Sequence, residues 1–329
     1  MGLKTKARSF LSALVLVITS GCRDQDGVTV VKLAHGLDVN HSVHKAMEIM
    51  AQDLNVLSQG SMRIDIYPNE QLGTERQLLE LLQIGSVGMT KVSAAVLENF
   101  APEFRVLGLP YIFDSETHHF EVLDGTVGSD MLLSLETFRL RGLTFYDAGS
   151  RSFYLKEHSV KSPADLEGLK IRTQESATAM ELVRRLGGSA TPIAWGELFS
   201  ALQQGIVDGA ENNLPSFYLS GHFETARYYS VNEHTRVPDV LLISTLVWDT
   251  LTELEQSWLT EAAHNSKLKQ RELWKESVEQ ALSEVQAAGV KVTWPDQSLF
   301  AARVKPIYDS FRNNPRMYEL IQNIRRQPD

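Results

Sequence analysis

The chain has 329 residues, which is enough for two domains of ordinary size, each with its own core. Hydrophobic residues make up 43% and charged residues 22%, proportions that are typical of a soluble globular protein and that argue against disorder. The net charge of -9 and the lack of basic runs beyond the N-terminus argue against a nucleic-acid surface, while a local pair of arginines stays compatible with a small anionic ligand.

Residues 1–27 have the features of an export signal. Three basic residues within positions 4–8 precede a short apolar stretch, residues 10–18, which is shorter than the roughly 20 residues of a membrane-spanning helix. Cys22 is the only cysteine, so no intramolecular disulfide can form. Its position after two small residues resembles a bacterial lipoprotein cleavage site, although Thr19 stands where an aliphatic residue is usual. We expect a periplasmic protein, either anchored through a lipid on Cys22 or released by ordinary signal cleavage.

Short apolar segments alternate with helical patterns over residues 28–146, and this alternation predicts an α/β domain. Thr74 and Gln77 have the spacing of a capping box, so a helix is expected to begin there. Lys91 falls inside an apolar strand and must either face outward or have a partner, because lysine is seldom buried unpaired. The predicted strands are residues 28–34, 62–67, 87–93 and 142–146, and the predicted helices are residues 41–57, 75–84 and most of 117–140.

After Gly149 the chain is predicted to cross into a second domain. Ser162, followed by a proline and then by Asp165 at the third position, gives a helix-start signal. Residues 254–288 form the longest helical pattern, and at about 1.5 Å per residue this helix would be roughly 50 Å long, enough to span two domains. The predicted strands are residues 169–173, 206–210, 240–247 (returning to the first domain) and 290–292, helices are expected at 176–186 and 195–204, and residues 300–324 complete the second domain.

Two arginines, Arg151 and Arg172, lie at the edges of apolar β-like segments. A guanidinium group is always charged and offers a planar fork of donors, so two such groups facing one cleft would form a fixed receptor for a carboxylate. From the residues alone, arginines at such positions are more often ordinary surface residues than parts of a ligand site.

Sequence blocks that occur in one order along the chain after residue 27 supply that context. The blocks are Gln71-Leu72-Gly73 with Glu75-Arg76, Leu109-Pro110-Tyr111, residues 162–166 and 168–172, Thr191-Pro192, Glu197, Ala201-Leu202-Gln203 and residues 207–212. Together they resemble the DctP-type solute-binding proteins that serve TRAP (tripartite ATP-independent periplasmic) transporters. Several blocks in a fixed order are more specific than any single motif.

This resemblance implies an α/β, two-lobed periplasmic binding protein fold of type II-like form, with a long helix spanning both domains. The ligand cleft is expected between strand ends, where open sheets generally bind ligands. The expected division is residues 1–27 as signal and linker, 28–149 plus 238–277 as domain I, and 150–237 plus 278–329 as domain II.

The resemblance also implies roles for individual residues. Arg172 is expected to pair with the ligand carboxylate, with Arg151 and Asn212 completing the cage. The other expected ligand-binding residues are Glu75, Lys91, His35 and Asn213 as a polar wall, Trp195 as a stacking aromatic, and Asp239 as a hydroxyl acceptor. From the residues alone, each of these also has a structural alternative, such as a helix-start acid, a turn-forming asparagine or a core tryptophan.

The polar wall resembles that of members that bind hexuronic acids such as glucuronate or galacturonate, and a simple C4-dicarboxylate would not use it. We therefore predict a hexuronate-binding protein that delivers its ligand to TRAP membrane subunits, without a cofactor. No metal site is expected, because His41 and His44 lack a third ligand at suitable spacing. The alternatives are a C4-dicarboxylate or other sugar-acid binding protein, a sensor module that engages a receptor, and a periplasmic enzyme. An enzyme is disfavoured, since the sequence has no GxSxG, HExxH, CxxC or Gly-rich dinucleotide motif.

Overall fold

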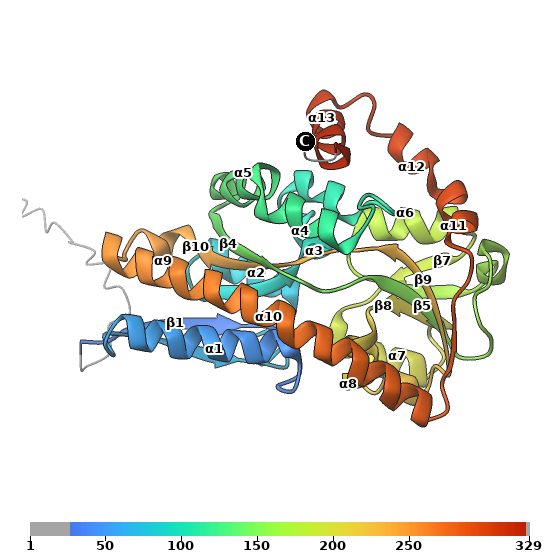
Figure 1. Cartoon of the computed structure of the whole chain (residues 1–329), viewed down its shortest axis with the longest axis horizontal. Helices are drawn as coiled ribbons and strands as arrows, with labels where there is room; N and C mark the ends of the chain where they lie inside the picture. The colour runs from blue at the N-terminus through green and yellow to red at the C-terminus, as the bar shows by residue number, and fades with distance from the viewer. Residues whose placement is uncertain (1–26, 327–329) are drawn as a thin grey trace, which may run out of the picture.

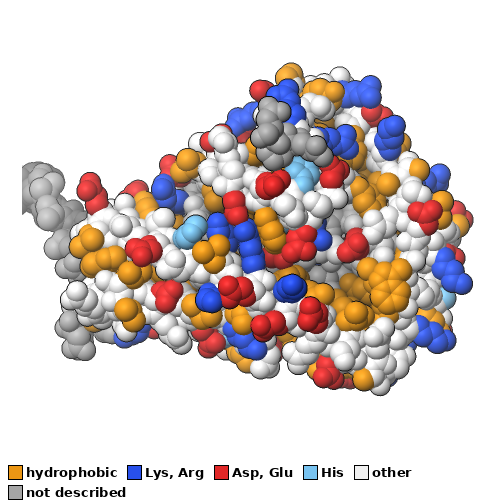
Figure 2. All heavy atoms as spheres, viewed as in Figure 1, with side chains coloured by type: hydrophobic (Ala, Val, Ile, Leu, Met, Phe, Trp, Pro, Cys, Tyr) orange, Lys and Arg blue, Asp and Glu red, His pale blue; other side chains and the backbone are white. Residues whose placement is uncertain are grey.

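The structure is a computed structural model that describes residues 27–326. The predicted export segment, with Cys22, lies outside these residues. Two mixed sheets, each covered by helices, lie side by side, and a long helix runs along both (Figure 1). Acidic and basic side chains are mixed over the face along which this helix runs, as expected for a solvated surface (Figure 2).

The first sheet contains the strands predicted in the first half of the chain together with one returning strand. Its order is β2-β1-β3-β10-β4, with β1 parallel to both of its neighbours and β10 antiparallel to both of its neighbours. The position of β10 between β3 and β4 shows that the chain returns to the first sheet, as the sequence predicts for the strand that begins near residue 240. The strands are β1 (Thr29–Ala34), β2 (Met62–Tyr67), β3 (Met89–Ser93), β4 (Leu140–Tyr146) and β10 (Asp239–Ser244).

The second sheet has the order β11-β9-β5-β8-β6-β7. Its β5 is antiparallel to β8 and β9, whereas β6 is parallel to β7 and β8. The strand expected at residues 206–210 begins later, because Ile206 is exposed and only the following residues pair with the sheet. The strands are β5 (Arg151–Leu155), β6 (Lys170–Thr173), β7 (Ser189–Pro192), β8 (Gly209–Asn212), β9 (Tyr228–Thr235) and β11 (Lys291–Thr293).

Most of the helices that the sequence predicts begin within about two residues of the expected position, and capping side chains mark several of these starts. Thr74 and Gln77 form the expected capping box, and Thr252 forms another at the start of the long helix. The segment expected to be mostly helical after residue 117 is divided at Gly125, whose extended backbone ends one helix and caps the next. The helices of the first half are α1 (Ser42–Leu57), α2 (Glu75–Gln83), α3 (Ala94–Leu97), η1 (Pro102–Gly108), α4 (Glu116–Asp124), α5 (Thr126–Ser134) and η2 (Leu135–Phe138).

The helices of the second half are shorter, except for the long one. The helix start predicted at Ser162 opens a single 3-10 turn. These helices are η3 (Pro163–Leu166), α6 (Ala177–Arg185), η4 (Trp195–Glu197), α7 (Leu198–Gln203), α8 (Leu214–Leu219), η5 (His222–Glu224), α9 (Thr245–Trp248), α10 (Glu253–Ala287), α11 (Gln297–Val304), α12 (Pro306–Asp309) and α13 (Pro315–Arg325).

Helix α10 has 35 residues and confirms the prediction of a long spanning helix. It packs against α1 beside the first sheet and against α8 beside the second (Figure 1). Two short links, residues 147–150 and 236–238, join the sheets. The buried Gln270 of α10 fixes the first link, since its side chain hydrogen-bonds both the N–H and the C=O of Asp147, at 2.8 and 2.7 Å.

The C-terminal elements contact both halves of the molecule. Helix α11 packs on β9 and α6, next to the second sheet, whereas α13 packs on α5 and η1 of the first half. The division of the chain into two domains therefore stays a prediction, with α13 lying against the first of them.

Candidate functional site

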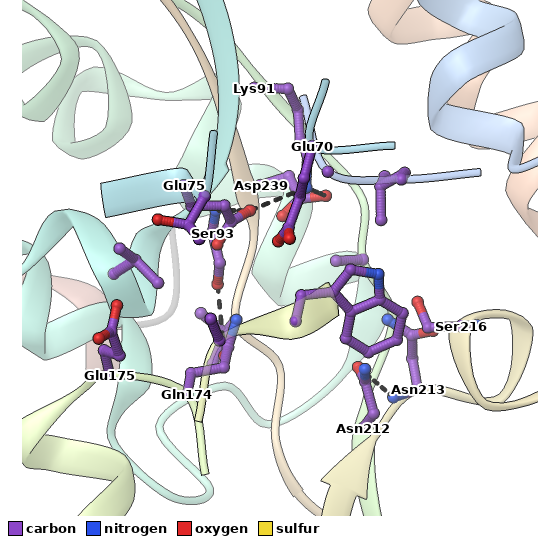
Figure 3. A pocket seen from close by; sticks show the side chains of 18 of the residues that line it. Glu70, Glu75, Lys91, Ser93, Gln174, Glu175, Asn212, Asn213, Ser216 and Asp239 are labelled. Carbon is purple, nitrogen blue, oxygen red and sulfur yellow. Dashed lines mark hydrogen bonds and ion pairs between the residues drawn. The ribbon is translucent and has the colours of Figure 1, made fainter. Parts of the chain in front are cut away.

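A cavity lies between the two sheets and is lined by residues of both. Its polar side chains come from both sheets and point towards one another (Figure 3). Many of them lie at strand ends: Ser93 ends β3, Asn212 ends β8, Arg151 begins β5 and Asp239 begins β10. All the predicted ligand-binding residues except His35 line this cavity.

Arg151 is already paired within the protein. Its guanidinium binds the Glu211 carboxylate through Nε at 2.5 Å and Nη2 at 2.9 Å, and it binds Asn212 Oδ1 through Nη1 at 2.8 Å. Burial alone would raise the pKa of Glu211, but the charge and hydrogen bonds of Arg151, together with His234, bring this pKa down to about 2. The charge of Arg151 is therefore largely compensated before any ligand arrives.

Arg172 is in the opposite situation. The residue is 3% exposed, its Nε donates to the carbonyl oxygen of Ile193 at 2.9 Å, and its Nη1 is buried without a hydrogen-bond partner. It forms no ion pair with any residue in the described part of the chain, 27–326. Burial lowers the pKa of Arg172, although neighbouring acidic groups oppose this effect. A buried, unpaired guanidinium is costly, and an anion in the cavity would remove that cost.

The first sheet contributes a cluster of opposite charges, which explains the lysine inside β3. Lys91 is 3% exposed, and its Nζ lies 3.2 Å from Glu75 Oε1 and 3.1 Å from Asp239 Oδ2. Burial alone would lower the pKa of Lys91, and the two carboxylates outweigh it and raise this pKa. Glu75 Oε1 also accepts the N–H of Ser93 at 3.1 Å. The cluster presents carboxylate oxygens to the cavity, and these can accept hydrogen bonds from hydroxyl groups.

Trp195 and the two asparagines line the second-sheet wall. Trp195 is half-buried, and the Arg172 guanidinium lies 5.9 Å from the centre of its ring. Asn212 Oδ1 accepts hydrogen bonds from Arg151 and from the N–H of Asn213, both at 2.8 Å. Asn213 Oδ1 caps α8 by accepting the N–H of Ser216 at 2.8 Å, so this side chain also has a structural task.

His35 is fully buried and does not line the cavity. Its Nε2 lies 2.9 Å from Nδ1 of His44 in α1, and its Nδ1 accepts the N–H of Leu37 at 3.1 Å. Burial, with a contribution from the charge of Lys91, lowers the pKa of His35 to about 2, so the ring is neutral. The histidine that does line the cavity is His41, whose Nε2 lies 3.3 Å from Ser216 Oγ of α8.

Other cavity residues were not predicted from the sequence. Glu70 follows β2 and reaches across to the second half, where its Oε1 accepts the N–H of Gly196 at 3.3 Å. Gln174 directly follows β6, and its position after a predicted strand end was the only signal for it. Glu70 and Ser216 gave no comparable signal, because their places depend on how distant segments pack.

Comparison with known proteins identifies the family. Residues 33–314 match the model of the DctP family, described as bacterial extracellular solute-binding protein, family 7. A curated solute-binding protein of Chromohalobacter salexigens is 34% identical over 282 residues, covering 85% of this chain and 84% of its own length. The chain belongs to the DctP family.

Solved structures of TRAP periplasmic solute-binding proteins share the fold of this DctP-family protein. One from Bradyrhizobium sp. BTAi1, in complex with alpha/beta-D-galacturonate, has a TM-score of 0.88 and 37% identity, covering 90% of this chain and 99% of its own. Another, from Chromohalobacter salexigens with bound D-glucuronate, has a TM-score of 0.87 and 32% identity, with the same two coverages. The predicted two-lobed α/β binding-protein fold and the predicted solute-binding function are thereby confirmed, and the family consists of binding proteins and not of enzymes.

Two further findings concern residues 27–326 of this DctP-family protein. In that range, no helix is both long enough and apolar enough to cross a membrane. Within the same residues, no three His, Cys, Asp or Glu side chains are grouped so that they could hold a metal ion.

Proposed function

We propose that this protein captures a hexuronate, such as galacturonate or glucuronate, in the cavity between the two sheets. The observation that carries the proposal is Arg172, a buried guanidinium whose Nη1 has no hydrogen-bond partner and which lines the same cavity as several carboxylates. A hexuronate has one carboxylate for the arginine and several hydroxyl groups for the wall. The galacturonate and glucuronate bound to similar proteins support this ligand class.

Each end of the ligand has its own set of partners in this proposal. Arg172 takes the carboxylate through a bidentate contact, and Arg151 with Asn212 adds charge and hydrogen bonds beside it. Glu75 and Asp239 accept hydrogen bonds from sugar hydroxyl groups. Lys91 holds these two carboxylates in place and donates hydrogen bonds to the ring oxygen or to hydroxyl oxygens of the sugar. Trp195 covers one face of the sugar ring. We assign no ligand contact to His35, and Asn213 acts mainly as the cap of α8.

The ligand would be enclosed by closure of two lobes, residues 28–149 plus 238–277 and residues 150–237 plus 278–329. Hydrogen bonds that cross the cavity rim support this part of the proposal, among them Asn99 Nδ2 to the carbonyl of Glu175 at 2.5 Å and Glu70 to Gly196 at 3.3 Å. The links between the sheets would act as hinges, and ligand would shift the lobes towards the closed form. TRAP membrane subunits would then receive the ligand from that form.

Export depends on residues 1–27 in this proposal, and the position of Cys22 after two small residues favours a lipid anchor over simple release. Mass spectrometry of the mature protein tests this directly. A diacylglyceryl-modified N-terminal Cys22 supports the anchor, and an unmodified N-terminus at another residue contradicts it.

Isothermal titration with D-galacturonate, D-glucuronate and succinate tests the ligand class, with melting temperature as a second readout. A ligand that binds only the native state raises the melting temperature, so at least one hexuronate is expected to bind and to raise it, while succinate does neither. Binding of succinate with no response to either hexuronate would overturn the sugar-acid proposal. Arg172→Ala is expected to abolish the response, and the exposed Arg185→Ala is the matched control on the same half of the protein.

A further inference from the structure

The charged side chains of the cavity are distributed unevenly between its two sides. The second-sheet side holds Arg172, which has no ion-pair partner among residues 27–326, Arg151, which Glu211 compensates, and Glu175, which lies beyond the end of β6. The first-sheet side holds Lys91 and three carboxylates that line the cavity, Glu70, Glu75 and Asp239. One ammonium group therefore faces three acids, and this side keeps an excess of negative charge when all of them are ionised.

The three carboxylates are close enough to influence one another. Burial is the main cause that raises the pKa of Glu70 and that of Asp239, and the negative charge of Glu75 raises both further. Lys91 contacts Glu75 and Asp239 but is not hydrogen-bonded to Glu70. In Figure 3 the Glu70 carboxylate points into the cavity from the same side as Glu75, Lys91 and Asp239. We call Glu70, Glu75 and Asp239 the acidic wall.

A ligand group opposite Arg172 must therefore donate hydrogen bonds to carboxylates. Hydroxyl groups can do so, because each carries a proton and no charge. A second carboxylate has no proton to donate, and like charges brought together in a buried site repel strongly. The acidic wall thus favours acids with a hydroxyl group, and disfavours acids with a second carboxylate, at the end of the molecule opposite the carboxylate bound by Arg172.

We propose that the acidic wall makes this site selective for sugar acids with a single carboxylate and excludes aldaric acids, which carry one at each end of the same carbon skeleton. The inference rests on the proposed function, because it takes Arg172 as the site of the first carboxylate. It goes further by assigning specificity to three residues of the opposite wall, Glu70 among them, which no feature of the sequence indicated.

The test compares D-glucuronate, D-gluconate and D-glucarate by isothermal titration. Glucarate and gluconate are both open chains and differ only in the terminal group, a carboxylate against a hydroxymethyl group. Wild-type protein is expected to bind glucarate at least about 100-fold more weakly than gluconate, the order expected for an unfavourable juxtaposition of like charges. Equal affinity for these two acids, whether strong or weak, would overturn the inference.

A double variant, Glu70→Gln with Glu75→Gln, provides a gain-of-binding test that misfolding cannot imitate. Glutamine keeps the shape and the acceptor oxygen, removes the charge and adds donors, so affinity for glucarate is expected to rise at least about 10-fold. The control is Glu80→Gln, which neutralises one exposed carboxylate of α2 outside the cavity and should leave glucarate affinity unchanged. Unchanged glucarate affinity in the double variant would refute the role of the wall. Failure of wild-type protein to bind any of the three acids would instead refute the proposed function.

Discussion

The same substitution at the two cavity arginines should have opposite effects on the stability of the ligand-free protein. Arg151 forms an ion pair with a buried carboxylate, whereas Arg172 forms none with any residue in the described range. Arg172→Met removes a cavity guanidinium that has no ion-pair partner among residues 27–326. We expect a loss of about 2–5 kcal/mol of ligand binding, or roughly 30- to 4,000-fold in Kd. The free energy of unfolding without ligand should stay the same or rise, since the variant buries no unpaired charge and gives up one hydrogen bond, to Ile193, and one contact with the Trp195 ring.

Arg151→Met should instead destabilise the protein. The pKa of Glu211 falls from its usual 4.5 to about 2 beside Arg151. At about 1.4 kcal/mol for each pH unit, this difference corresponds to about 3 kcal/mol. Because the folded-state pKa is the lower one, the stabilisation is complete above pH 4.5 and is lost as the pH falls towards 2. Removing Arg151 leaves Glu211 buried without its partner, so a loss of about 3–5 kcal/mol is expected at pH 7.

Urea unfolding at pH 7 without ligand, combined with isothermal titration of a hexuronate, measures both effects. Arg185→Met serves as control, because Arg185 is exposed and pairs only with Glu181 one turn away; it should change stability by less than about 0.5 kcal/mol and leave binding unchanged. If Arg172→Met destabilises the protein as much as Arg151→Met does, the division into a free and a committed arginine is wrong.

Three further substitutions probe the link between the sheets and the cover of the cavity. Burial raises the pKa of Asp147 from 3.8 to about 6, so ionisation costs the folded state about 3 kcal/mol once the pH exceeds both values. Asp147→Asn should therefore raise the free energy of unfolding by about 2–3 kcal/mol at pH 8 and hardly at all at pH 3.5. If urea titrations show an equal effect at both pH values, ionisation of Asp147 is not the cause. Gly149 has a φ of +58°, and an added Cβ would lie 2.9 Å from the Trp274 ring. Gly149→Ala should therefore lower the free energy of unfolding by at least about 1 kcal/mol. A melting temperature equal to that of wild type would contradict this prediction. Trp195→Ala should weaken hexuronate binding by about 1–2 kcal/mol, mainly through faster dissociation, if the indole covers the sugar; an unchanged dissociation rate in stopped-flow measurements would exclude that role.

Much of the cavity could be located from the sequence because strand ends are local features. Arg151, Arg172 and Asn212 follow from apolar segments whose boundaries are marked by charged or turn-forming residues. The parallel pair β6 and β8 brings Arg172 and Asn212 to one edge of the sheet, and the antiparallel β5 brings its first residue, Arg151, to the same edge. The resemblance in motif order then predicts which of the strand ends contact the ligand. His35 shows the limit of this argument, because a residue at a strand end can turn either into the cavity or, as here, into the packing of α1.

The sequence by itself determined most of the strands, though not β7 or β9, together with several capped helix starts, the long α10 and the presence of two arginines at strand edges, since each depends on residues close together in the chain. Only the tertiary structure decided how the charges are paired. Glu211 lies 60 residues from Arg151, and the lysine of β3 meets one acid from α2 and another from β10. Whether a buried charge is compensated or free depends on such distant neighbours, because the strength of an ion pair depends on separation in space and on burial, neither of which the order of residues specifies.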